Sequence, residues 1–348
     1  MSKHQLDNLP AEIWQLVAQI DELKGQWVAG LRISPQVLDR LKKSVLITSS
    51  GASTRIEGAQ LSDQEVSQLI QGIDIKKFVS RDVQEVQGYY QLLVKVFDSW
   101  PSLSFTEGTI KHFHQELLKY VKKDKLHRGE YKRIDNKVRL VNAIGKVGRI
   151  LFNTTPAVFT PTQMHDLVEQ TRDDLAQKQS HQLLTIARFI VVFLQIHPFT
   201  DGNGRLSRIL TNLLLLKAGY GFMLYVSHEK MIEDQKVDYY LALRQTQQSL
   251  GTDDEDLIPW FRFFLLVVLQ QAQEAVALLK DENIVKLFSP AQLKVLEYLQ
   301  QSREATASEI AQVLRIPRPT VYQSLQKLIK FRQAISLGQG RATRYMVL

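Results

Sequence analysis

Apolar residues recur at helical spacing along most of the 348-residue chain. The period is clear near the N-terminus, in a helix opened by Pro35, and in two helices expected between residues 82 and 122. The positions that carry it include Ile13, Leu16, Val17, Ile20, Val37, Leu38, Leu41, Val86, Tyr90, Leu93, Val94 and Phe97. This pattern predicts a mainly α fold, with short helices in the first 80 residues.

Two stretches are far more apolar than a one-sided helix requires. Residues 189–194 are apolar without interruption, and residues 260–269 are strongly apolar. Such helices are buried nearly all round in the core of a protein. Both runs are shorter than the roughly 20 residues that span a bilayer, so we expect no membrane segment.

Alternation with a period of two replaces the helical period after Gly129. Apolar residues at 138, 140 and 141 and at 150–152 flank a segment that contains Gly145 and Gly148. Central glycines between alternating runs favour a β-hairpin over residues 138–152. A surface loop is the alternative for this segment.

The C-terminal part has a pattern of its own. Helices are expected over 290–301, 307–313 and 318–331, followed by strands over 334–337 and 343–347. Three helices and a hairpin resemble a winged helix-turn-helix. Its candidate DNA contacts are Arg318, Thr320, Tyr322 and Gln323 in the groove and Arg341 and Arg344 on phosphates. Dimerisation or target docking is the alternative, so DNA and a homodimer both remain open as partners.

Composition narrows the class of protein. The chain has no cysteine, which excludes disulfides and thiolate metal sites, and its first thirty residues do not form a signal peptide. Hydrophobic content of 44% and charged content of 23% are ordinary for a soluble protein, so a cytoplasmic location is expected. The net charge of +8 suits an anionic partner, either ATP or nucleic acid.

Candidate chemistry is concentrated in residues 197–208, His-Pro-Phe-Thr-Asp-Gly-Asn-Gly-Arg-Leu-Ser-Arg. Pro198 disfavours helix at His197, so the buried helix should end there, and a second helix should begin at Arg205. Glycines allow a tight loop between them, whose free N–H groups form an anion cradle. Arginines three apart on one helix face suit a polyphosphate, and no P-loop ending is present.

Two further side chains complete a phosphate-transfer site. Asp201 offers a hard oxygen ligand beside the phosphates, where Mg²⁺ would bind. His197 is the one group in the stretch that can accept a proton near neutral pH. Taken singly, each residue could serve an ordinary turn or helix cap, but together they indicate phosphate chemistry.

This stretch resembles the signature of the Fic family, and every fixed position is met. The resemblance implies a helical core that transfers AMP from ATP to a hydroxyl side chain of a target protein. It makes His197 the base, Asp201 the Mg²⁺ ligand and Phe199 the anchor of the loop. The implied nucleotide contacts are Gly202, Asn203, Gly204, Arg205, Leu206, Ser207, Arg208 and Tyr240. In the related Doc toxins lysine replaces the second loop glycine and phosphate is transferred, so Gly204 favours AMP transfer.

Residues 49–58 are small and polar, and composition alone favours a loop or a frayed helix end. However, Ser53, Glu57 and Gly58 match the motif Ser/Thr-x-x-x-Glu-Gly/Asn that inhibits many Fic proteins. A carboxylate aimed at Arg208 would take the guanidinium fork that the γ-phosphate of ATP needs. The resemblance therefore implies autoinhibition by Glu57.

The same resemblance divides the chain into three parts. We expect a regulatory segment over 1–80, a catalytic core over 81–280 and the winged helix over 285–348, with a linker at 280–282. The hairpin would be the flap that holds a protein substrate by strand addition. For Tyr240, a place in the core is the alternative. Two other functions remain open: a DNA-binding regulator with an idle or self-modifying Fic core, and a Fic enzyme that removes AMP.

Overall fold

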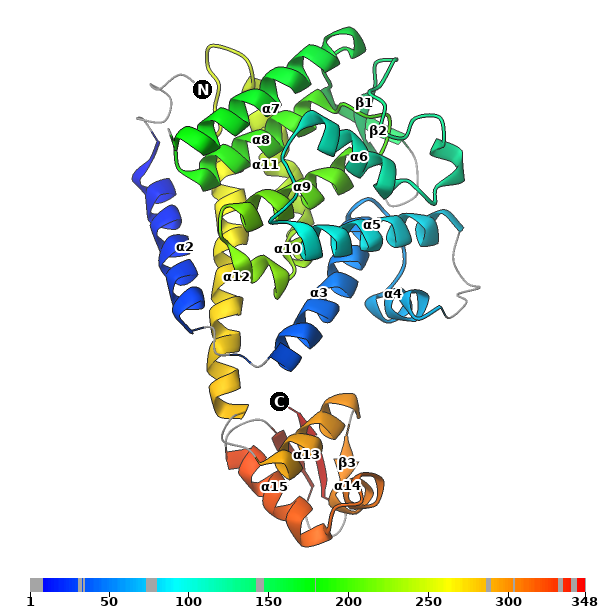
Figure 1. Ribbon diagram of the computed structural model, residues 1–348, viewed down its shortest axis with the longest axis vertical. Coiled ribbons are helices and arrows are strands. Elements are labelled where there is room, and N and C mark those ends of the chain that lie inside the picture. The colour runs from blue at the N-terminus through cyan, green and yellow to red at the C-terminus, as the bar shows by residue number, and fades with distance from the viewer. Residues whose placement is uncertain are drawn as a thin grey trace. The chain divides into compact units, whose positions relative to one another are not determined.

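The protein folds as two compact units, residues 1–276 and 277–348. The computed structural model describes residues 9–30, 33, 35–72, 80–141, 147–178, 180–285, 289–302, 304–330, 334–338 and 343–347. The first unit is helical apart from one hairpin, and it contains both the N-terminal helices and the stretch 197–208 (Figure 1). The predicted mainly α fold is confirmed.

The first unit is built mainly of helices. They are α2 (Ala11–Gly30), α3 (Pro35–Ile56), α4 (Asp63–Ile70), α5 (Ser80–Ser99), α6 (Glu107–Leu117), α7 (Thr160–Gln177), α8 (Gln182–Ile196), α9 (Asn203–Lys217), α10 (His228–Asp234), α11 (Lys236–Ser249) and α12 (Ile258–Val285), with 3₁₀ turns at Lys122–Asp124, Ala157–Phe159 and Gly221–Leu224. At the centre, α8 and α9 bury nearly all their side chains, so their apolar composition is explained by burial on all sides.

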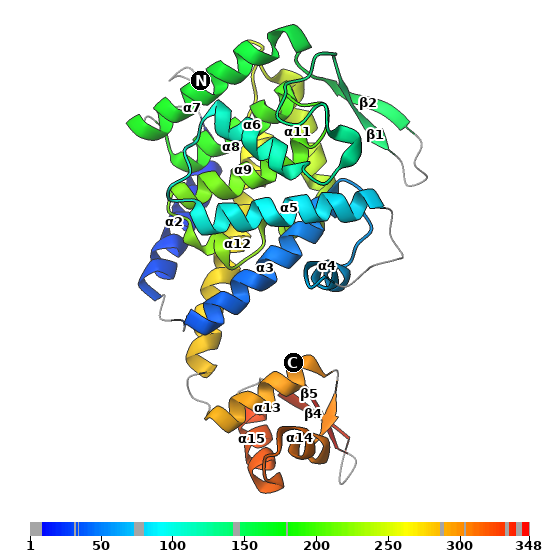
Figure 2. The same ribbon diagram turned by 45° about the vertical axis from the view of Figure 1, so that its right-hand side comes forward.

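The small polar segment 49–54 is helical rather than a loop. It forms the last turns of α3, which pack against α5 and α10, and α3, α4 and α5 lie side by side in two views (Figure 1 and Figure 2). Ser50 and Thr54 donate hydrogen bonds to the carbonyls of Leu46 and Ser50 within the helix, at 2.7 and 2.9 Å. The small side chains are fully buried, so they allow close packing of helices. Composition alone favours a loop or a frayed end here, and packing explains why the segment is helical instead.

The predicted hairpin is present. Strand β1 (Lys137–Val141) pairs antiparallel with β2 (Val147–Asn153), with Lys137 opposite Asn153 and Val141 opposite Val147. The turn between the strands lies outside the described residues.

Helix α12 is longer than expected. It continues to Val285, so the backbone of the expected linker at 280–282 is helical. It also contains a stretch, Ile258–Leu279, that is 22 residues long and apolar enough to cross a membrane by length and composition. The expectation that every apolar run is too short was therefore wrong. Packing accounts for this apolar composition, since Trp260, Phe261 and Leu265 are buried and the Trp260 indole donates to the carbonyl of Ala187 at 2.7 Å.

The second unit has the three helices and the hairpin that the sequence predicts. Its elements are α13 (Pro290–Gln301), β3 (Ala305–Thr306), α14 (Ala307–Leu314), α15 (Arg318–Lys330), β4 (Ala334–Leu337) and β5 (Arg344–Val347). The short strand β3, which we did not predict, adds to the hairpin to give the strand order β3-β5-β4. Ser289 and Thr306 cap α13 and α14 with capping boxes. Arg341 lies outside the described residues.

Candidate active site

His197 lies at the exit of α8, as its neighbour Pro198 predicts. Its backbone is left-handed, with φ 51° and ψ 60°, and its N–H still bonds to the carbonyl of Phe193 at 2.9 Å. The ring Nδ1 faces the carbonyl of Leu194 at 3.3 Å, so Nδ1 carries the proton and Nε2 keeps a lone pair. Burial lowers the pKa of His197 to about 4, which leaves the imidazole neutral at physiological pH. A neutral ring with a free Nε2 is the form that a general base requires.

The loop after His197 is closed by side chains that bond to its own backbone. The amide of Asn203 accepts from the N–H of Phe199 at 3.0 Å and donates to its carbonyl at 2.8 Å. Gly202, at φ +79°, makes the turn into α9, which begins at Asn203, two residues before the predicted start. Phe199 is fully buried, as expected, and stacks on His114 with 3.8 Å between ring centroids. The Asn203 side chain therefore shapes the loop.

His114 ties the same loop to α6. Its Nδ1 accepts from the N–H of Gly129 at 2.9 Å, which makes Nε2–H the donor to the carbonyl of Asp201 at 3.0 Å. Burial lowers the pKa of His114 to about 4, so this pair of bonds is made by a neutral ring. The sequence gives no sign of this role, because a lone histidine in a helix has no distinctive spacing.

Asp201 and Arg205 belong to an ion-pair network with α5. Arg81 and Arg205 both donate to Oδ2 of Asp201 at 2.9 Å, and Glu85 pairs with both arginines, at 2.7 and 2.8 Å. Burial alone would raise the pKa of Asp201, but the arginines outweigh it and lower the pKa. Arg205 is 3% exposed and already has two carboxylate partners, so its first role is to hold Asp201 in place.

Mg²⁺ suits the position of Asp201. Among the described residues no group of three or more His, Asp or Glu could hold a metal ion by itself. Mg²⁺, however, commonly binds to one or two carboxylates together with substrate phosphates. Both arginines donate to Oδ2, so Oδ1 has no arginine partner and can face a cation beside the cradle.

Arg208 is occupied by α3. Its Nε donates to the Ser53 hydroxyl at 2.8 Å, and the same terminal nitrogen donates to the Ser53 carbonyl at 2.9 Å and to Oε1 of Glu57 at 2.7 Å. Burial opposes its charge, but the Glu57 carboxylate more than offsets this and raises the pKa of Arg208. The carboxylate also lies over the start of α9, where a Cβ on Gly204 would come within 2.3 Å of Oε1. Glu57 thus takes the anion position at the N-terminus of α9.

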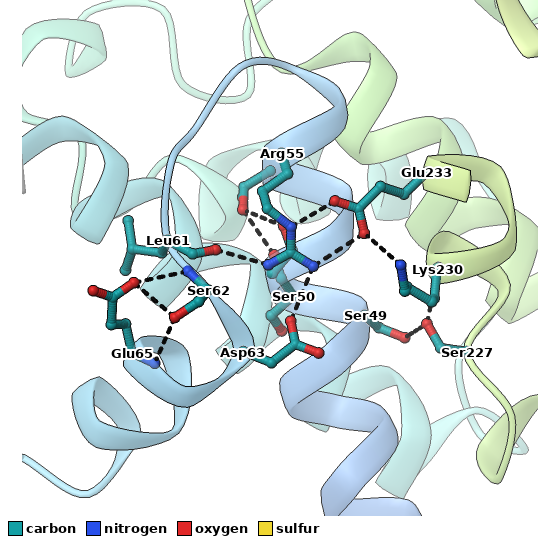
Figure 3. Close-up of polar contacts among 12 residues, drawn as sticks. Ser49, Ser50, Arg55, Leu61, Ser62, Asp63, Glu65, Ser227, Lys230 and Glu233 are labelled. Carbon is teal, nitrogen blue, oxygen red and sulfur yellow. Dashed lines mark hydrogen bonds and ion pairs between the residues drawn. The ribbon is translucent and has the colours of Figure 1, made fainter. Parts of the chain in front are cut away.

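A second arginine fixes the end of α3 that carries Glu57. Arg55 lies between Glu233 of α10 and Asp63 of α4, and it bonds to both carboxylates and to the carbonyl of Leu61 (Figure 3). Two residues further along, Glu57 points to Arg208 instead. Arg55 therefore connects the end of α3 to two neighbouring helices, a role that the sequence did not reveal.

The remaining predicted residues lie around this centre. Tyr240 on α11 reaches the carbonyl of Ile56 at 3.5 Å, beside Glu57, and burial raises its pKa. Leu206 is part of the core, and Ser207 bonds within α9 to the carbonyl of Gly204 at 2.8 Å. Gly58 closes the end of α3 with a bond to the carbonyl of Arg55 at 3.1 Å. The predicted nucleotide-site and inhibitory-motif residues thus lie on α8, α9, α11, the loop before α9 and the end of α3, and several of them already bond to other groups of the protein.

Known protein families match both units. The model of the Fic/DOC family matches residues 104–215, from the start of α6 almost to the end of α9. Residues 104–215 form a Fic domain. A helix-turn-helix domain model matches residues 287–330, which cover the three helices of the second unit.

Relatives of the Fic domain include enzymes named as protein adenylyltransferases. The chain is 30% identical over 113 residues to protein adenylyltransferase fic-1 of Caenorhabditis elegans, covering 30% of this chain and 20% of that protein. It is 26% identical over 221 residues to protein adenylyltransferase Fic of Drosophila willistoni, covering 58% of this chain and 38% of that protein. The chain therefore matches less than half the length of either relative.

Solved structures with a Fic domain share the fold. A Fic family protein from Desulfovibrio desulfuricans G20 superposes with a TM-score of 0.65 at 23% identity, over 98% of this chain and 97% of that one. Fic-1 of C. elegans superposes with a TM-score of 0.63 at 18% identity, over 78% of this chain and 74% of that one. The first likeness extends over both units of the chain.

Proposed function

We propose that this chain is a protein adenylyltransferase that moves AMP from ATP to a hydroxyl of a target protein, and that Glu57 inhibits it. One observation carries the proposal: the buried Arg208, in the second turn of α9, donates from Nε and one terminal nitrogen to Ser53 and Glu57. A carboxylate at an anion cradle stands where a phosphate oxygen would bind. The names of the relatives agree with this chemistry.

The transfer step assigns a task to each group. Nε2 of His197 takes the proton of the target hydroxyl, whose oxygen attacks the α-phosphorus of ATP. A new O–P bond forms, the bond from the α-phosphorus to the β-phosphate bridging oxygen breaks, and pyrophosphate leaves. Amides at the start of α9 hold the phosphates in line, and Arg208 binds the outer ones. Mg²⁺ held by Asp201 would neutralise phosphate charge.

The β1–β2 hairpin supports a protein as the acceptor. Each strand end nearest the site joins a loop that bonds to the backbone of the His197 region. An extended target segment could add to a free strand edge, and its hydroxyl would then approach His197. The Fic resemblance is the reason to propose that residues 138–152 form the flap that holds a protein substrate.

A labelling experiment tests the reaction class. The Glu57→Gly variant, with and without His197→Ala, is incubated with ATP labelled in the α- or the γ-phosphate, and labelled protein is counted. We expect label only from the α-phosphate, and a loss of about 10²–10⁴-fold in rate with His197→Ala, because the general base is gone. Label from the γ-phosphate would indicate phosphate transfer instead. Release of AMP from a modified target by water, without addition, would indicate an enzyme that removes AMP.

DNA binding is a second candidate function, favoured by the face of α15. Its exposed residues include Arg318, Tyr322, Gln323 and Lys330, and the helix has no acidic residue. This matches the demand for cations and hydrogen-bonding groups on a helix that enters a groove. We expect the full chain to bind duplex DNA with an affinity that falls steeply with salt, and Arg318→Ala to weaken it. Absence of binding at low salt would leave docking or dimerisation.

A further inference from the structure

Lys132 is a buried cation beside the catalytic loop. Its side chain is 4% exposed, and its ammonium donates to three oxygens at 2.9 Å: the carbonyl of Ile196, the amide of Asn136 and the hydroxyl of Thr154. All three donors are satisfied, but every acceptor is neutral. Among the described residues no carboxylate oxygen lies within 4.0 Å of this ammonium, the limit for an ion pair. A buried charge without an ionic partner costs free energy, so we expect Lys132 to have a function that offsets this cost.

Lys132 bonds to the backbone on both sides of His197. Its side chain bonds to the carbonyl of Ile196, and its backbone N–H bonds to the carbonyl of Pro198 at 2.8 Å. His197 has a positive φ, a conformation that non-glycine residues adopt only when their surroundings hold them there. One residue thus fixes the two carbonyls that set the direction of the imidazole.

The same residue closes the base of the hairpin. Asn136 directly precedes β1 and Thr154 directly follows β2, and the Thr154 hydroxyl donates to the carbonyl of Asn136 at 2.8 Å. Asn136 also donates to the carbonyl of Phe199 at 3.0 Å. Both ends of the hairpin are therefore joined, through Lys132 and Asn136, to the loop that carries His197.

We infer that Lys132 is a positioning residue for the proposed transfer reaction. It fixes the position of His197 relative to the hairpin, and it places a positive charge beside the imidazole. The inference rests on the proposed function. The chemical effect follows from charge. A cation near a neutral imidazole disfavours a second proton on the ring, so His197 stays a base.

Charged groups from three segments act on His197. Burial is the main cause of its low pKa; Lys132 lowers the pKa further, whereas Glu57 at the end of α3 and Asp201 in the loop raise it. Burial also lowers the pKa of Lys132 itself, to about 8, so Lys132 still carries its charge at neutral pH. Removing that charge should raise the pKa of His197.

Lys132→Met tests the inference, because methionine keeps much of the volume and loses the charge and the donors. The parent for all variants is Glu57→Gly. We expect kcat to fall about 10- to 100-fold while KM for ATP stays within about twofold, since a misplaced base costs rate and not nucleotide binding. The acid limb of the rate profile should move up by about one pH unit. Lys132→Arg, which keeps the charge, should leave that limb in place.

Two further measurements keep the inference falsifiable. If Lys132→Met does not fold, Thr154→Val serves in its place, because it removes one acceptor and keeps Lys132. We expect Thr154→Val to lower kcat as well. NMR titration of ¹³C-labelled histidines, assigned with His197→Ala, reports the pKa of His197 without any reaction. If AMP transfer is absent but the pKa of His197 rises in Lys132→Met, the proposed function fails and the inference about charge stands. An unchanged pKa of His197 together with an unchanged kcat would overturn the inference.

Discussion

Arg205 and Arg208 lie three residues apart on α9, yet their surroundings differ. Arg205 pairs with Glu85 and Asp201, which belong to α5 and to the loop before α9. Among the described residues, the carboxylate that pairs with Arg208 is Glu57, which has a third of its side chain exposed and follows α3. The sequence treats both as phosphate ligands. The structure gives them different partners, and we propose that Arg205 is a permanent brace whereas the contact at Arg208 is exchangeable, so that a phosphate can replace Glu57.

The largest expected effect is on the free energy of unfolding, which should fall more when Arg205 is replaced than when Arg208 is replaced. Arg205→Met takes the buried partner from Glu85 and leaves it paired with the more exposed Arg81, and removing one member of a buried pair costs about 3–5 kcal/mol. Arg208→Met leaves Glu57, which can turn to water, so the main loss is a charged hydrogen bond worth about 1.5–3 kcal/mol. Urea unfolding of both variants measures the free energy of unfolding. Equal losses would contradict a distinction between brace and exchangeable contact.

Low pH should lower the free energy of unfolding through His114, which bonds to the loop that carries Asp201. The pKa of His114 is about 4 in the folded protein and about 6.5 when unfolded, so the unfolded chain binds the extra proton first as the pH falls. The free energy of unfolding is therefore fully retained above pH 6.5 and declines towards pH 4, by up to about 1.4 kcal/mol per pH unit for this group. His114→Gln should show a slope shallower by about that amount between pH 6 and 5. Parallel slopes would assign the effect to other groups.

The smallest expected effect concerns Arg55, which fixes the end of α3 and so the Glu57–Arg208 contact. Arg55→Met should release the end of α3 and raise self-modification about 2- to 12-fold, the equivalent of a net hydrogen bond of 0.5–1.5 kcal/mol. Arg262→Met is a matched control, because it breaks an exposed ion pair with Glu12 elsewhere in the unit. Labelling from α-labelled ATP compares them. If the two variants label alike, Arg55 does not hold the inhibitory contact.

Contiguous chemistry was predictable from the sequence. The groups from His197 to Arg208 are placed by one helix end, one loop and one helix start, and all three are local features. The β1–β2 hairpin and the winged helix were equally readable, because periodicity and caps are local signals too. The comparisons confirm the Fic domain and the helix-turn-helix.

Long-range pairing was not predictable. Arg205 is 120 residues from Glu85, and nothing in the spacing of either residue marks the pair. Composition alone does not identify the helix at 49–54, because small polar residues suit both a loop and a close helix contact. The helical backbone at 280–282 was not predicted, because charges interrupt apolar periodicity without interrupting a helix.

Autoinhibition by one exchangeable carboxylate is the central claim, and one comparison tests it most directly. Self-modification from α-labelled ATP is measured for the wild type, Glu57→Gly, and Glu57→Gly with Arg208→Met. We predict a near-silent wild type, a rise of about 10- to 150-fold on removal of Glu57, the equivalent of a charged hydrogen bond of 1.5–3 kcal/mol, and a return to silence in the double variant. Unchanged or lower labelling in Glu57→Gly would contradict the account.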